Sequence, residues 1–392
     1  MVGAALALAL AQRGFSVAVL EAHPPALEWA PESHDLRVSA ITRASQHLLQ
    51  NLGVWSAMAE DRITPYRQMR VWDRAGFGEI CFDAVDLGEP DLGHIVENRV
   101  IVRALWRALG DQGVAVRAPA QLRVLETGEE GAVLELADRS RLRVGLAVGA
   151  DGARSQVRAL AGIGTRGAPY DQHALVATVS AERGNQAAAW QRFMHDGPLA
   201  LLPLQRDLFS IVWSTRPEQA ARLCDIAEGE FNGALTEASE ARLGALCLVG
   251  ERAVFPLRQQ HAARYVGPAL ALVGDAAHVI HPLAGQGVNL GFLDAAALVD
   301  ALLDGREQGR PAGALRDLRA YERSRRGHNT ATQFAMDAFK HLFGNDSGPL
   351  SLARNLGLGV AGRLTPLRRT FERVALGQGP GLPTLSRPPG PH

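Results

Sequence analysis

The sequence has few cysteines, no surplus of charge of either sign and no long hydrophobic run. Its three cysteines, Cys81, Cys224 and Cys247, form no CxxC pair, which predicts free thiols rather than a disulfide framework or a zinc site. The 41 basic residues balance the 41 acidic residues, and this excludes the positive surplus of a dedicated nucleic-acid binder. No apolar run reaches the roughly 18 residues of a membrane span, and residues 1–11 lack the basic start of a secretory signal. We therefore expect a cytoplasmic protein.

The composition is that of a large folded protein. Of the 392 residues, 47% are hydrophobic and 21% are charged. Such a chain can bury an extensive core and does not have the profile of a disordered protein. At roughly 150 residues per domain, its length predicts two or three domains or one large two-part unit.

The first 21 residues resemble half of a nucleotide-binding unit. Residues 3–14 are rich in Ala and Leu and end at a glycine, and residues 15–20 form a β-branched run before Glu21. This order predicts the second half of a dinucleotide-binding βαβ unit, with Gly3 near a pyrophosphate and Glu21 on a ribose hydroxyl. The alternative is a simple buried N-terminal helix. The strand and two glycines that open a full fingerprint are absent, so we expect the native protein to carry residues upstream of Met1.

Two acid-bearing glycine turns follow predicted strands. Residues 149–152 contain Asp151 and Gly152, and Gly274 precedes Asp275. Ligands of α/β sheets bind beyond the carboxyl ends of the strands, where an Asp can accept from a ribose hydroxyl and a glycine lets the backbone approach the ligand. Each turn alone is also compatible with an ordinary Asp-Gly turn. Their combination with the first 21 residues favours a nucleotide site.

Residues 281–294 form a glycine-rich loop that opens a helix. The segment holds Gly285, Gly287 and Gly291. Free N–H groups and the positive end of a helix suit the negative charge of a reduced flavin, so we expect this loop to seat an isoalloxazine ring. The alternative is an ordinary glycine-rich helix start capped by Asn289.

These motifs together resemble one family. Residues 281–294 resemble the signature of the ubiquinone-biosynthesis FAD-dependent monooxygenases, and residues 149–152 and 274–275 resemble the two Asp-Gly motifs of group A flavin monooxygenases. The similarity extends from Gly3 to about Gly377. Three further stretches are similar to the same family: residues 37–42, 52–55 and 94–98.

The resemblance implies an α/β (α+β) fold like that of p-hydroxybenzoate hydroxylase. In that fold a Rossmann-type FAD-binding domain is interleaved with an antiparallel β-sheet substrate domain, and C-terminal helices follow. Strand-like runs between residues 174 and 215 agree with such a sheet, and the Gly/Pro-rich end predicts disorder. The expected boundaries are 1–65, 95–168 and 266–345 for the FAD-binding domain without its first strand, 66–94 and 169–265 for the substrate domain, 346–376 for a C-terminal helical region and 377–392 for a disordered tail.

The resemblance also implies the site residues. The implied cofactor-binding set is Gly3, Glu21, Arg37, Arg103, Asp151, Gly152, Gly274, Asp275, Pro282, Gly285, Gln286, Gly287, Val288 and Asn289. His281 and the adjacent Pro282 are the catalytic candidates, because an imidazole beside the flavin loop can help to deprotonate a phenol. The alternative is that His281 only packs. We expect no metal site, because His278 and His281 lack third and fourth ligands.

The activity implied by the resemblance is aromatic hydroxylation. FAD, NAD(P)H and O2 would hydroxylate a polyprenylated phenol or benzoquinol intermediate of ubiquinone biosynthesis through a C4a-hydroperoxyflavin. Three alternatives share the motifs: a non-catalytic flavoprotein-like scaffold in a quinone-biosynthesis complex, a prenyl reductase and a soluble phenol hydroxylase. A flavin halogenase is disfavoured, because it needs a lysine between flavin and substrate and the only lysine, Lys340, lies in a C-terminal helix.

The C-terminal region suggests where the protein works. Residues 350–376 interleave five arginines with leucines and oppose them with one acid, Glu372. Such a basic amphipathic segment can rest on an anionic membrane or a lipid-carrying partner. The alternative is a helix pair packed on the FAD domain. We therefore expect a polyprenylated substrate, contact with other ubiquinone-biosynthesis proteins, a peripheral position at the inner membrane, a capacity to form homo-oligomers and no nucleic-acid partner.

Overall fold

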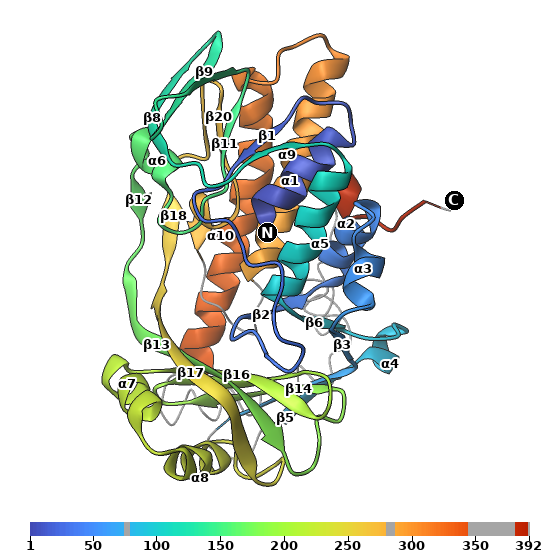
Figure 1. Ribbon diagram of the computed structural model, residues 1–392. Coiled ribbons are helices and arrows are strands. Elements are labelled where there is room, and N and C mark those ends of the chain that lie inside the picture. The colour runs from blue at the N-terminus through green and yellow to red at the C-terminus, as the bar shows by residue number, and fades with distance from the viewer. Residues whose placement is uncertain (74–78, 280–286, 344–380, 391–392) are drawn as a thin grey trace.

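The computed structural model describes residues 1–73, 79–279, 287–343 and 381–390. It has a helix-rich half and a half built on one seven-stranded sheet (Figure 1). Long strands connect the two halves, and the chain passes between them four times. The expected class, an α/β fold with a β-sheet part inserted between nucleotide-fold segments, is confirmed.

Four helices and two parallel strand pairs form the centre of the helix-rich half. Helix α1 is buried along almost its whole length, because its side chains are Ala and Leu on every face. It packs between α5 and α9, and α10 covers α9 (Figure 1). Strand β1 pairs with β7, and β11 pairs with β20. The bounds are α1 Val2–Ala11, α5 Asn98–Asp111, α9 Gly287–Glu307, α10 Leu315–Phe343, β1 Ala18–Leu20, β7 Ala115–Arg117, β11 Ala147–Gly149 and β20 Leu270–Leu272.

Smaller elements surround this centre. The antiparallel sheet β2-β6-β3 faces the other half, the meander β10-β9-β8 lies at the far end, and β12-β18-β21 lies beside the long connecting strands. Their bounds, with those of neighbouring short elements, are β2 Val38–Ile41, α2 Arg43–Asn51, α3 Trp55–Ala59, β3 Ile63–Tyr66, β6 Gly93–Glu97, β8 Leu122–Gly128, β9 Gly131–Leu136, β10 Arg141–Val144, α6 Gln156–Leu160, β12 Thr165–Arg166, β18 Gln260–Ala262, β19 Val266–Gly267, η1 Gly274–Ala276 and β21 His278–Val279.

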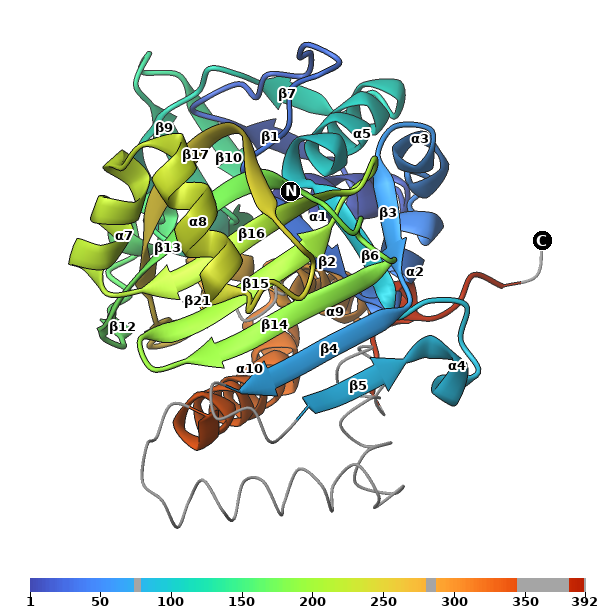
Figure 2. The ribbon, with the colours of Figure 1, turned by 90° about the horizontal axis from the view of Figure 1, so that it is seen from below.

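The second half is a sheet with strand order β17-β13-β16-β15-β14-β4-β5. It is antiparallel as expected, except that β14 runs parallel to β4, with Ala188 opposite Gln68. Helices α7 and α8 cover one face, as Figure 2 shows, and the other face is turned toward β2-β6-β3. The bounds are β4 Gln68–Asp73, β5 Glu79–Asp83, α4 Ala84–Leu87, β13 Pro169–Ala181, β14 Ala188–Met194, β15 Gly197–Pro203, β16 Leu208–Thr215, α7 Pro217–Asp225, α8 Glu228–Ala238 and β17 Leu246–Arg258.

The end of the chain differs in part from the expectation of a disordered tail. Residues 381–390 are described and include the short 3-10 helix η3, Thr384–Ser386. Leu385 is buried, and the Asn51 side-chain amide donates to its carbonyl oxygen. The Thr384 backbone N–H also donates to Asp300 of α9 at 2.8 Å, so burial and hydrogen bonds together hold η3 against α2 and α9. The expected helical region 346–376 lies outside the described residues.

Candidate functional site

Three glycines bring separate segments together at the start of α1. A Cβ atom on Gly3 would lie 2.9 Å from the Cβ of Ala150, and one on Gly291 would lie 2.6 Å from Val2 Cγ2 and 3.2 Å from the Cα of Gly274. All three spacings are shorter than ordinary carbon contacts of about 3.5–4.0 Å. Only glycine permits this packing, so the start of α1 meets the 149–152 turn, the 274–275 turn and helix α9 at one point.

Charged groups near the start of α1 influence one another electrostatically. The Met1 amino group starts α1, and burial lowers its pKa while the negative charges of Glu21 and Asp275 raise it. Burial raises the pKa of the Asp275 carboxyl, and the positive charges of His278 and Arg37 act against that rise. The Asp275 side chain nevertheless remains accessible to solvent. These electrostatic effects relate Glu21 to Met1 and Arg37 to Asp275. That Gly3, Glu21, Arg37 and Asp275 bind one cofactor stays a prediction.

Beneath this point lies a buried carboxylate that the sequence reasoning missed as a site residue. Asp294 on α9 is 0% exposed. Its Oδ2 accepts from the backbone N–H of Gly274 at 3.1 Å and lies 2.5 Å from His278 Nε2. Its Oδ1 accepts from Arg325 Nε at 2.9 Å and from Asn329 Nδ2 at 3.1 Å. This carboxylate ties α10, α9 and the 274–275 turn together.

The charge of Asp294 is stabilised by these partners. Burial alone would raise its pKa, but His278 and Arg325 hold the pKa of this carboxyl far below its ordinary value. A fully buried charge is retained at such cost only when it is paired and hydrogen-bonded. The sequence does contain a signal, since Asp294 is a lone charge in the apolar run 290–299, and Arg325 and Asn329 stand four apart on one helix face.

Asn289 connects the glycine-rich segment to β2. Its side-chain Nδ2 donates to the Ala40 carbonyl oxygen at 2.7 Å, and its Oδ1 accepts from the Thr42 backbone N–H at 3.1 Å. The residue is buried. These two hydrogen bonds fix the end of β2 against the start of α9.

The 149–152 turn serves the start of α6. The Asp151 carboxylate accepts from the Ser155 hydroxyl and from the backbone N–H groups of Gln156 and Val157, the latter two at 2.7 and 3.0 Å. Gly152 has φ +80°, a backbone conformation that favours glycine. Both residues lie next to Ala150, which touches Gly3. A role of Asp151 and Gly152 toward a cofactor therefore remains a prediction, compatible with their place.

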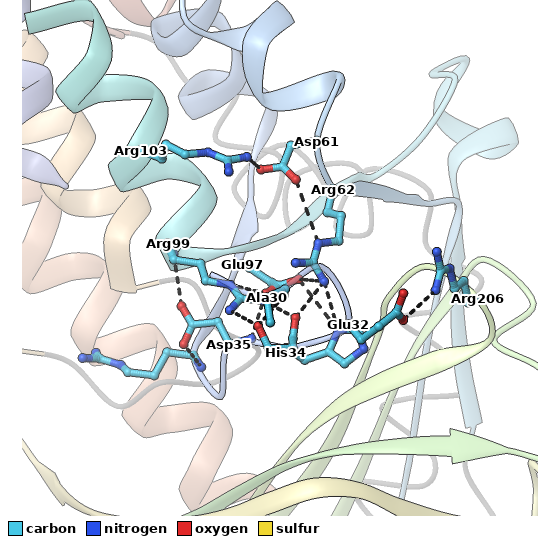
Figure 3. A network of polar contacts seen from close by, with 12 residues as sticks. Ala30, Glu32, His34, Asp35, Asp61, Arg62, Glu97, Arg99, Arg103 and Arg206 are labelled. Atoms are coloured by element: carbon cyan, nitrogen blue, oxygen red, sulfur yellow. Dashed lines mark hydrogen bonds and ion pairs between the residues drawn. The ribbon is translucent and has the colours of Figure 1, made fainter. Parts of the chain in front are cut away.

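Arg103 lies in a polar network, drawn in Figure 3, that holds residues 22–37 (the 22–37 loop). Its guanidinium pairs with Asp61 and stacks on the Trp29 ring at 4.1 Å. At the centre of the network, buried Glu97 binds Arg99 at 2.7 Å and Arg62 at 3.3 Å. The contacts with Asp61 and Trp29 place Arg103 against the 22–37 loop, which also carries Arg37.

The network holds the second half of the loop at several points. The Glu97 carboxylate accepts from the Asp35 backbone N–H at 2.7 Å, and Asp35 in turn accepts from the Arg37 backbone N–H at 3.0 Å. Glu32 pairs with Arg206, which sits in the turn between β15 and β16, at 3.1 Å (Figure 3). The backbone position of Arg37 is thereby set by a buried charge cluster.

The residues that the structure describes fit FAD. The start of a buried helix offers free N–H groups and a positive dipole end for a pyrophosphate, and Glu21 and Asp275 are accessible or half-buried acceptors beside it. The close packing of Gly3 and Gly291 keeps side chains out of this region. Within the described ranges no group of three His, Cys, Asp or Glu side chains could hold a metal ion. Four predicted residues lie outside those ranges: His281, Pro282, Gly285 and Gln286.

Comparisons with known proteins agree with this site. A model of the FAD binding domain family matches residues 1–335. The 3-demethoxyubiquinol 3-hydroxylase of Escherichia coli (strain K12) is 42% identical over 378 residues, covering 96% of this chain and 96% of that protein. The ubiquinone hydroxylase UbiL of Rhodospirillum rubrum is 39% identical over 391 residues, covering 99% and 90%. The p-nitrophenol 4-monooxygenase PnpA from Pseudomonas putida DLL-E4 shares the fold with a TM-score of 0.76 over 97% of this chain and 96% of that chain, at 20% identity.

Sequence similarity over nearly the full length, a family model that covers most of the chain and a helix start shaped for a dinucleotide therefore agree. The chain belongs to the FAD binding domain family and, within it, to the ubiquinone-biosynthesis FAD-dependent monooxygenases.

Proposed function

We propose that this protein hydroxylates the ring of a polyprenylated phenol or quinol intermediate of ubiquinone biosynthesis, with FAD, NAD(P)H and O2. The observation that supports the proposal is the close glycine packing at the start of α1, together with the electrostatic influence of Glu21 on Met1 and of Arg37 on Asp275. It occurs in a chain 42% identical to a 3-demethoxyubiquinol 3-hydroxylase.

The residues at the start of α1 would bind and orient FAD. The α1 N-terminus would face the pyrophosphate, Glu21 would accept from the adenosine ribose and Asp275 from the ribityl chain. Arg37 would supply positive charge from the opposite side. When bound, FAD supplies the redox chemistry by which NAD(P)H and O2 deliver one oxygen atom.

The seven-stranded sheet would receive the substrate. Its face toward the helix-rich half is largely apolar, with Ala189 and Leu202 packed against Ala40, Tyr66 and Ile95. An apolar chamber excludes water from an oxygen-activating site and favours a hydrophobic ring. Burial raises the pKa of Tyr66 to about 12, so its phenol stays neutral at working pH.

The place of action follows from the substrate. In the described part of the chain, no helix is both long and apolar enough to cross a bilayer. A polyprenylated ring partitions into membranes, so we place the protein in the cytoplasm and peripherally at the inner membrane. There it would contact other ubiquinone-biosynthesis proteins and could assemble with copies of itself.

The first test is the visible absorption spectrum of the purified protein before and after FAD is added and the excess removed. We expect a retained flavin band. The holoprotein is then mixed with NAD(P)H, 18O2 and a prenylated phenol. Incorporation of 18O into the ring supports the proposal, whereas reduction of the substrate without 18O supports a prenyl reductase. A folded protein that retains no flavin supports the scaffold alternative.

A further inference from the structure

One buried amide in the sheet has no hydrogen-bond partner. Gln191 on β14 is 5% exposed, and its Oε1 accepts no hydrogen bond from any residue the structure describes. Leaving a buried acceptor unpaired costs roughly 1–3 kcal/mol. Because nearly all buried polar groups in folded proteins are paired, an unpaired one calls for an explanation such as a ligand or an ordered water.

The neighbours of Gln191 across the sheet cannot pair with it. Residues opposite each other in a sheet share a face, and Gln191 stands opposite Val71 on β4 and Ala200 on β15. The next residue along this row is Val212 on β16. The whole row is aliphatic apart from the amide, so the sheet itself provides no donor.

Gln191 faces the helix-rich half. Successive strand residues alternate between faces. Trp190, the residue before it, packs in the core with Phe231 and Leu235 of α8, whereas Ala189 packs with Ala40 and Ile95 of the β2-β6-β3 sheet. Gln191 therefore shares the face of Ala189, on the side where we place the substrate.

A small cavity lies at this amide. It measures about 10 Å³, which is room for one water molecule or one hydroxyl group and too little for an aromatic ring. Ala40, Tyr66 and Ile95 line it from the helix-rich half, and Gln191, Ala200 and Leu202 line it from the sheet. The cavity is surrounded mainly by apolar side chains.

A hydrogen bond connects the wall of the cavity to the segment expected to seat the flavin ring. The Ala40 carbonyl oxygen accepts from Asn289 Nδ2 at the start of α9, at 2.7 Å. Ala40 itself lines the cavity. The strand that forms its wall is therefore held by a residue of the segment expected to seat the flavin ring.

We propose that this cavity is a hydroxyl subsite, in which the Gln191 amide oxygen accepts a hydrogen bond from a neutral hydroxyl group of the substrate ring. The inference rests on the proposed function. The amide does not remove the proton, which stays on the ring oxygen. Its effect is to fix the rotation of the ring, and hence which carbon faces the cofactor.

The test combines one change in the protein with one change in the ligand and measures binding for every combination. The FAD-loaded wild type, Gln191→Met and Gln191→Leu are titrated with a prenylated phenol and with its O-methyl ether, and Kd is measured by calorimetry. The ether lacks the donor. We expect the wild type to prefer the phenol by roughly two- to tenfold, the range of one net hydrogen bond, and both variants to lose the preference. Binding avoids the separate effect of the ether on ring reactivity.

A control and a second readout separate a subsite from a structural role. Thr178→Val removes a buried hydroxyl from the same face of the sheet, three strands away from Gln191, and should keep the preference. Without ligand, Gln191→Met should unfold at the same temperature as the wild type or higher, because an unpaired buried acceptor is removed. Unchanged preference in the Gln191 variants, or a clear fall in their Tm, overturns the inference while leaving the hydroxylase function intact. If the wild-type holoprotein binds neither ring, the function and the inference both fail.

Discussion

Replacing Gly291 by alanine tests the packing on which the cofactor site depends. Two effects oppose each other. Alanine favours a helix interior over glycine by about 1 kcal/mol. The new Cβ, however, would lie 2.6 Å from Val2 Cγ2 and 3.2 Å from the Cα of Gly274. Overpacking of this kind typically costs about 1–3 kcal/mol, so we expect Gly291→Ala to destabilise the protein by a net of roughly 0–2 kcal/mol.

Gly327→Ala is the matched control. Gly327 lies inside helix α10, is exposed, and a Cβ atom there would meet nothing within 4 Å. Only the propensity term applies, so this variant should be up to about 1 kcal/mol more stable than the wild type. The two variants make the same chemical change, and their difference isolates the contact at the start of α1.

The assay measures thermal unfolding of both variants and the flavin each retains after FAD is added and the excess removed. Gly291→Ala should unfold below Gly327→Ala and retain less flavin, because Val2 and Gly274 must move and both border the expected pyrophosphate region. If Gly291→Ala is as stable as Gly327→Ala and holds as much FAD, the close packing of these three segments does not shape the site, and our account of it is wrong.

Three further predictions follow from the buried charges. Asp294→Ala leaves His278 and Arg325 buried without their carboxylate and should lower the free energy of unfolding by about 3–5 kcal/mol. The control Asp304→Ala, on the exposed side of α9, should change it by less than about 0.5 kcal/mol. Equal Tm values for the two variants would contradict the role of Asp294. Glu97→Gln should speed limited proteolysis of the 22–37 loop and weaken FAD binding, because Arg62 and Arg99 lose their charged partner, while Glu135→Gln, which breaks the exposed pair with Arg141, should do neither. Burial lowers the pKa of His94, so near and below about pH 6.5 the unfolded chain binds more protons than the folded protein. The free energy of unfolding should therefore fall as the pH is lowered from about 7.5 to about 5.5, and this fall should be smaller in His94→Gln. A variant whose Tm depends on pH as the wild type's does would refute this role of His94.

The sequence predicted those features that local chemistry determines. The Ala- and Leu-rich helix at residues 3–14, the strand before Glu21 and the turn at Gly274 were placed correctly, because helix propensity and glycine turns act over a few residues. The family resemblance supplied the order of the interleaved segments. Both the fold class and the family were confirmed.

Features that depend on tertiary contacts were missed. The role of Asp294 arises from partners 16 to 35 residues away along the chain. The sequence marks Asp294 as a lone charge in an apolar run, but it does not show that these partners contact it. The lack of a partner for the Gln191 acceptor follows from the strand pairing, which places the aliphatic residues Val71 and Ala200 opposite it. Residues 381–390 were expected to be disordered, but Leu385 is buried and this stretch forms hydrogen bonds with Asn51 of α2 and Asp300 of α9, contacts that exist only in the folded protein.

The four passages of the chain between the two halves have a consequence for movement and for modularity. Neither half is a continuous piece, since the seven-stranded sheet combines residues 68–83 with residues 169–258 through the parallel pair β4–β14. Such pairings between distant segments form late and slowly during folding. They also act as four tethers, so that a rotation of one half against the other must bend all of them at once. If the proposed function holds, the backbone path therefore sets the distance between a substrate on the sheet and a cofactor in the helix-rich half. Neither half can be transferred between relatives as one continuous segment.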